Sequence, residues 1–151
     1  MINVRVILNI LGLLLLIEGI SMLLPLGVSI YYNEGDIAAI AISSGISIVI
    51  GAFSWLLTQR SDKTITKREG YIIVSIVWII FSLFGSLPFI ISGEITSYTD
   101  AFFETISGFT TTGASILNDV GTLPHGLLFW RSMTQWLGGM GIIVLSLAIL
   151  P

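Results

Sequence analysis

The chain has 151 residues, of which 54% are hydrophobic and 10% charged, with a net charge of −3. Globular proteins carry roughly 25% charged residues, so this composition indicates an integral membrane protein and excludes the soluble classes. Six basic residues without a basic arm give no support for nucleic-acid binding. A sequence without cysteine has neither a disulfide framework nor a thiolate metal site.

Residues 4–28 are apolar and long enough to cross a bilayer, at roughly 20 residues per crossing. A signal peptide with Arg5 in its n-region is the alternative, but the stretch is long for an h-region and no small-x-small cleavage site follows it. Glu18 lies inside this span, and a carboxylate within a membrane is a functional hypothesis by default. The alternative, which we favour, is a buried structural group that is protonated or hydrogen-bonded.

A polar turn at residues 31–36 precedes a second predicted span, residues 37–58. Small residues recur along this span at roughly helical spacing and predict a face for close helix packing, with no ligand role: Ala41, Ser44, Gly45, Gly51 and Ala52.

The loop at residues 60–69 holds four of the six basic residues. By the positive-inside rule this loop is cytoplasmic. The N-terminus with Arg5 is then cytoplasmic too, and the turn at residues 31–36 lies outside.

The third predicted span, residues 70–92, runs outward, and Pro88 is expected to kink or end its helix. Glu94 and Asp100 follow at the outer end, where acidic groups would raise the local concentration of cations. Ordinary solvated loop carboxylates are an equally good interpretation of each residue alone.

The sequence DAFFETISGFTTTGAS, residues 100–115, is too short and too polar in its second half to cross a bilayer. It predicts a pore loop, with a pore helix at residues 98–109 and a filter at residues 110–115. Rings of backbone carbonyls can replace the water around a cation, and the negative end of the pore helix dipole would face that cation. Gly113 can enter backbone conformations closed to residues with a Cβ, while Thr110, Thr111 and Thr112 add hydroxyls. Non-helical backbone at this depth must line a cavity or be buried in protein.

Residues 116–125 return to the outer surface, and residues 126–151 form a fourth predicted span, heading inward. His125, the only histidine, has no metal-ligand cluster in the sequence and is expected at the interface. Arg131 lies inside the fourth span and needs a partner or water. We expect it to pair with Glu104, with Gln135 in the same network; snorkelling of Arg131 to the outer interface is the alternative.

Three glycines in the fourth span, Gly138, Gly139 and Gly141, lower its helix propensity. They mark either close packing or a bend where a gate could form.

The sequence FETISGFTTTGAS followed by RSMTQWLGGMGIIVLSLAILP strongly resembles the Trk/Ktr/HKT superfamily of potassium transporters, most closely its bacterial TrkH-type subunits. The resemblance is strong over residues 70–151 and covers the first 60 residues only as a pair of extra helices. It implies an all-α integral membrane fold, with two leading transmembrane helices and a cytoplasmic loop in residues 1–69. One helix–pore loop–helix repeat of a potassium-channel-like fold would occupy residues 70–151.

The resemblance also implies function. Potassium would pass a filter of backbone carbonyls or hydroxyls from Thr110, Thr111, Thr112, Gly113 and Ala114, with Gly113 at the selectivity position. Glu104, Arg131 and Gln135 would give structural support. The family further implies uptake across the bacterial or archaeal cytoplasmic membrane, sodium or proton influence, a homodimer and a cytosolic nucleotide-binding regulatory subunit.

The family places four pore repeats in one polypeptide, whereas this sequence has one TTG-type run and no visible repeat. We expect the N-terminal part of a longer transporter; a short chain that assembles with copies of itself is the alternative.

Two other functions compete with transport. One is a non-conducting scaffold or assembly subunit, in which TTTGAS merely breaks a helix. The other, an intramembrane enzyme, is not expected, because the sequence has no nucleophile–base pair and neither a Gly-x-Ser-x-Gly nor a His-Glu-x-x-His motif.

Overall fold

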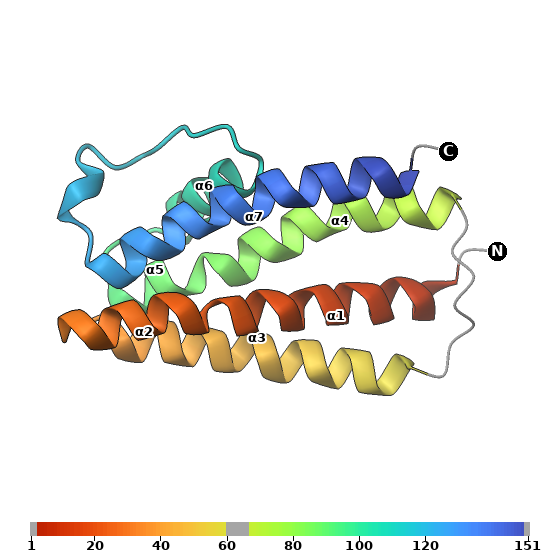
Figure 1. Cartoon of the computed structure of the whole chain (residues 1–151), viewed down its shortest axis with the longest axis horizontal. Coiled ribbons are helices and arrows are strands. Elements are labelled where there is room, and N and C mark those ends of the chain that lie inside the picture. The colour runs from red at the N-terminus through yellow and green to blue at the C-terminus, as the bar shows by residue number, and fades with distance from the viewer. Residues whose placement is uncertain (1–2, 60–66, 150–151) are drawn as a thin grey trace.

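The computed structural model describes residues 3–59 and 67–149, and every regular element in these ranges is a helix. Figure 1 shows long helices lying roughly side by side, with a loop between α6 and α7 that runs outside the bundle. The predicted all-α fold is confirmed. The predicted basic loop lies mostly outside the described residues.

The first predicted span is two consecutive helices, α1 (Val4–Ser21) and α2 (Leu23–Tyr32), which together make a 29-residue apolar segment. Pro25 has no N–H to give to the Ser21 carbonyl four residues earlier, which explains an interruption at this point. The Ser21 hydroxyl donates to the Glu18 carbonyl at 2.6 Å. The segment ends at Asn33, whose φ of 53° is left-handed.

Helix α3 (Ile37–Thr58) packs along α1 (Figure 1). A Cβ added to Gly51 would lie 2.8 Å from the Gly12 carbonyl oxygen, so this crossing requires glycine. The predicted small-residue face is only partly right. Ser44 and Gly51 are buried as predicted, and the Ser44 hydroxyl donates to the Gly19 carbonyl. Ala41 and Gly45 are exposed, whereas Ser43 and Ser47 belong to the buried face.

The third predicted span is also two helices, α4 (Lys67–Gly85) and α5 (Leu87–Ser92), with the break just before Pro88, as predicted. Three segments are apolar and long enough to cross a membrane among the described residues: Val4–Tyr32, Ile37–Thr58 and Arg68–Ser92.

Helix α6 (Tyr98–Phe109) has the bounds expected of the pore helix, and its first turn is capped by Ser97 Oγ, which accepts from the Asp100 N–H. An irregular segment and the short 3₁₀ helix η1 (Val120–Thr122) lead to α7 (His125–Ile149). Helix α7 is continuous through Gly138, Gly139 and Gly141. Gly138 serves close packing, because an added Cβ would overlap the Phe109 carbonyl.

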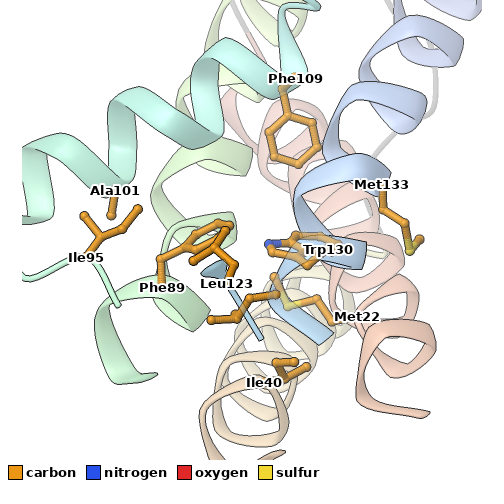
Figure 2. Packing of buried hydrophobic residues seen from close by; sticks show 10 residues of the cluster. Met22, Ile40, Phe89, Ile95, Ala101, Phe109, Leu123, Trp130 and Met133 are labelled. Carbon is orange, nitrogen blue, oxygen red and sulfur yellow. The ribbon is translucent and has the colours of Figure 1, made fainter. Parts of the chain in front are cut away.

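One hydrophobic cluster joins the leading helices to the rest of the chain. Figure 2 shows Met22, Ile40, Phe89 and Trp130, which come from four different parts of the chain, converging on one another. All four side chains are fully buried. The indole N–H of Trp130 donates to the Gly85 carbonyl at 2.8 Å, so α7 is tied to the end of α4 at the centre of the molecule.

Candidate functional site

The C-terminal end of α6 is fixed against α7 by two glycines. A Cβ on Gly108 would overlap the Thr134 hydroxyl, and a Cβ on Gly138 would overlap the Phe109 carbonyl. Phe109 itself is fully buried and packs near Trp130, with 6.4 Å between ring centroids. This backbone-to-backbone contact sets where the helix ends and where the following loop begins.

The loop after α6 is exposed throughout residues 110–116. Two of its residues have left-handed backbones, with φ of 57° at Thr111 and 76° at Gly113. Glycine adopts this conformation without strain, whereas a β-branched threonine does so at a cost of order 1–3 kcal/mol that the surroundings must offset. An added Cβ at Gly113 would meet nothing closer than 3.9 Å, so its backbone angle and not crowding favours glycine there.

Several hydrogen bonds hold the loop from the side of α6. The Ser107 carbonyl accepts from the N–H groups of both Thr112 (3.0 Å) and Gly113 (3.3 Å). The Ser107 hydroxyl donates to the Ala114 carbonyl at 2.6 Å. The hydroxyls of Thr110 and Thr112 lie 2.9 Å apart. Sequence reasoning missed Ser107, although it stands one helical turn before the loop in the motif that was singled out.

The second anchor of the loop is the carboxylate of Glu104, which is almost fully buried. Arg131 Nε donates to Glu104 Oε1 at 2.6 Å. The Ser115 hydroxyl lies 3.0 Å from both carboxylate oxygens, and the Ile116 N–H donates to Oε2 at 3.0 Å. The carboxylate thus receives donors from α7 and from the two residues that follow Ala114.

The expected pairing of Arg131 with Glu104 is therefore present, and Arg131 turns toward α6 with only 18% of its side chain exposed. Gln135 does not join this pair: the described residues show no hydrogen bond from its amide to Glu104 or Arg131. Its side-chain nitrogen instead lies on the side of Gly113, 3.9 Å from the position of an added Cβ. Gln135 lies one helical turn after Arg131 on α7, and its side chain faces the loop near Gly113 and not the Glu104 carboxylate.

The turn between α2 and α3 binds the N-terminus of α7. Glu34 accepts from the backbone N–H of His125 at 2.5 Å, and its other oxygen lies 2.6 Å from His125 Nδ1. The Asp36 carboxylate accepts from the Leu127 N–H at 3.0 Å and from the Ser29 hydroxyl. The Tyr32 ring stacks on His125 with 4.0 Å between centroids. Carboxylates are favourable at a helix N-terminus, where N–H groups are unpaired.

The hydrogen bond from the His125 side chain holds the pKa of Glu34 below its ordinary value. His125 is half exposed, in keeping with its expected place at the interface. The other acidic residues of this end, Glu94, Asp100 and Asp119, are exposed.

The chain is similar to known proteins along its length. A family described as cation transport protein, TrkH, matches residues 36–151. The Trk system potassium uptake protein TrkH of Halomonas elongata is 41% identical over 150 residues, which make up 99% of this chain and 31% of that relative. The Trk system potassium uptake protein TrkG of Escherichia coli is 38% identical, with the same coverage of each.

A crystal structure of the potassium transporter TrkH from Vibrio parahaemolyticus matches the fold with a TM-score of 0.93 at 40% identity. The match covers 99% of this chain and 32% of that one. The chain spans less than a third of the length of the relatives above. The sequence matches and the fold agree, and the chain belongs to the TrkH family of cation transport proteins.

Proposed function

We propose that this chain supplies one of about four pore repeats of a potassium uptake transporter. The observation that carries the proposal is the loop at residues 110–115, which is exposed and non-helical. Hydrogen bonds with Ser107 and Glu104 of α6 fix its conformation. Potassium would be bound by backbone carbonyls or hydroxyls of Thr110, Thr111, Thr112, Gly113 and Ala114. The names of the relatives, all potassium uptake proteins, support potassium as the transported ion.

The left-handed backbones at Thr111 and Gly113 support this use of the loop. Residues in this conformation alternate with residues of negative φ, so successive peptide groups do not form a helix. Their carbonyls therefore do not take part in the hydrogen bonds of a helix. The Ala114 carbonyl, which accepts from Ser107, has a second lone pair for an ion.

The ion pair behind the loop would act as its support. Glu104 is bound at once to α7 and to the first two residues after Ala114. A buried network that satisfies every member is rigid, and a rigid loop can hold oxygens at the spacing that an ion requires.

In this proposal residues 1–69 are the leading helices and the cytoplasmic loop, and residues 70–151 are the pore repeat. The transporter lies in the cytoplasmic membrane with its N-terminus inside, in contact with lipid and with the remaining repeats or further copies of the chain. A homodimer, a cytosolic nucleotide-binding regulatory subunit and coupling to sodium or protons belong to the same proposal by family resemblance.

Potassium-limited growth of an uptake-deficient bacterium tests the proposal. The reading frame is expressed both as the 151 residues alone and extended to its natural stop codon. We expect rescue by the extended form only, if one repeat cannot close a filter; rescue by the shorter form would mean assembly from identical copies. No rescue by either form, with both present in the membrane, would favour a scaffold or a required missing partner.

The matched test of the ion-binding loop is Gly113→Asp against Gly93→Asp. Both glycines have left-handed backbones, with φ of 76° and 82°, and neither is crowded. A side chain therefore costs similar backbone strain at both positions. We expect Gly113→Asp to abolish uptake or broaden its selectivity, and Gly93→Asp to keep selectivity. Equal effects on uptake, in proportion to the amount of folded protein, would contradict the role of the loop.

A further inference from the structure

Glu18 is a carboxyl group in the middle of the first membrane segment, and it is 1% exposed. Neither of its carboxyl oxygens has a hydrogen-bond partner among the described residues. The buried carboxyls of Glu104 and Asp36 behave differently, since each binds at least two donors. Burial without a donor therefore sets Glu18 apart from both.

The carboxyl group of Glu18 lies where the leading helices meet the proposed pore repeat. A Cβ added to Gly85, the last residue of α4, would lie 3.0 Å from Glu18 Oε1 and 2.9 Å from Thr105 Cγ2. It would also lie 3.0 Å from the Phe109 ring. Trp130 hydrogen-bonds the carbonyl of the same glycine. Phe109 and Trp130, seen in Figure 2, thus surround the point that Glu18 reaches from α1.

No positive group faces Glu18 from the helices packed around it, as far as the structure describes them. Helices α3 and α5 contain no titratable residue. The titratable residues of α4 precede Gly85 by at least 14 positions, which is about 21 Å of helix. On α1, Arg5 is 13 residues away, about 20 Å.

The remaining titratable groups nearby are accounted for. Arg131 pairs with Glu104, and His125 pairs with Glu34. Tyr31, Tyr32, Tyr98 and Asp100 are exposed. An ionised carboxylate without a partner in so apolar a place is strongly disfavoured, and such a group neutralises instead.

We propose that Glu18 is a proton-binding site that fastens the leading helices to the pore repeat. In its neutral form the carboxyl packs against Gly85 without the penalty of burying a charge. Helices α1, α4, α6 and α7 then pack against one another around it, at what we call the junction. When the carboxyl releases its proton to water, the resulting anion has no partner and must draw in water, which loosens the junction. Thr105 and Phe109 of α6 belong to that junction. Proton release would therefore loosen the packing of α6, the helix that precedes the ion-binding loop.

Infrared spectroscopy of the protein in hydrated phosphatidylcholine bilayers tests the protonation state directly. With ¹³C-labelled glutamate, the wild-type protein at pH 7 is expected to show the carbonyl band of a protonated carboxylic acid. Glu18→Gln should remove this band, and the matched control Glu94→Gln, which alters an exposed carboxylate, should leave it. A wild-type spectrum without a protonated glutamate band at pH 7 would overturn the proposal even if Glu18→Gln failed to fold.

The pH dependence of thermal unfolding tests the fastening role. A native state that holds one more proton than the unfolded chain becomes less stable as pH rises, by up to tenfold in the folding equilibrium constant per pH unit. We expect this decline in the wild-type protein as pH rises from about 4.3, where a glutamate of the unfolded chain titrates, through neutrality. Glu18→Gln should give a flatter profile, because its neutral amide cannot ionise. Identical profiles for the two proteins would overturn the proposal, because a carboxyl that is neutral in the native state and ionised in the unfolded chain must produce this difference.

Discussion

Glu104 directs the return of the chain after the proposed ion-binding loop, and it does so as one carboxylate with several donors. Arg131 supplies the charge that balances it, while Ser115 and the Ile116 N–H attach the loop. Both charged groups were predicted to meet, because each lies in a membrane segment and needs a partner. The attachment of Ser115 and Ile116 could not be predicted, because sequence spacing does not reveal which way an irregular segment turns.

Arg131→Met should destabilise the protein by about 3–5 kcal/mol, because it leaves the Glu104 charge buried without its counter-charge. The double variant Arg131→Met with Glu104→Gln should regain most of that loss, since no net charge is then buried. Denaturant unfolding in detergent measures both. The control is Ser132→Ala, which changes an exposed neighbour of Arg131. An additive double variant would show that the two side chains do not interact.

The lowered pKa of Glu34 predicts an acid-dependent contribution to stability. The folded pKa lies below the ordinary value of 4.5, so the stabilisation is fully present above that value and is lost as pH falls through the folded pKa. Thermal melts of wild type and Glu34→Gln should therefore differ at pH 6 and converge in acid. His125→Ala should reduce this difference, because it removes the side-chain hydrogen bond and leaves the backbone N–H donors of Glu34. A gap between wild type and Glu34→Gln that persists unchanged below the folded pKa would contradict this assignment.

Helix α6 is positioned by contacts that leave no room for a side chain at Gly108 and Gly138. Its bounds could be predicted from the apolar spacing and from the polar run that follows. The use of the glycines in α7 could not, because a glycine pair in a sequence is equally compatible with a bend and with a close contact. The buried face of α3 was predicted only in part for a related reason: small residues lie on two sides of that helix, and tertiary packing selects one.

Gly138→Ala and Gly139→Ala form a matched pair at the level of the helix contact. A Cβ at Gly138 overlaps the Phe109 carbonyl, so α6 and α7 must separate, at a cost of about 1–3 kcal/mol. A Cβ at Gly139 meets only the Thr111 methyl at 3.8 Å, and alanine favours the helix by about 1 kcal/mol. Thermal stability should fall in the first variant and hold or rise in the second. The same response from both would show that this contact does not position α6.

Among the described residues, two hydrophobic clusters are shared between the leading helices and the proposed pore repeat, although the sequence suggested a division near residue 69. In the larger cluster, Met22 and Ile40 of the leading helices are fully buried together with Phe89 and Trp130 of the repeat. Trp130 and Trp136 both lie in α7, six residues apart. The structure separates them, because Trp136 is 61% exposed.

Trp130→Phe should destabilise the protein by about 1–3 kcal/mol, because the Gly85 carbonyl loses its donor in a buried place. Trp136→Phe should change stability little. Because the cluster is shared, circular dichroism and near-ultraviolet signals should report one coincident transition in all three proteins. Two separated transitions would show that the leading helices unfold independently of the rest.

The carboxylates of Glu34 and Asp36 and the helix end that they cap are separated by about 91 residues of chain. At a synthesis rate of roughly 5–20 residues per second, the turn leaves the ribosome about 5–20 s before the start of α7. During that interval the N–H groups of α7 that the two carboxylates bind have not yet been made. This cap can therefore form only after the start of α7 has been made, so the contact between the α2–α3 turn and α7 is a late event in synthesis.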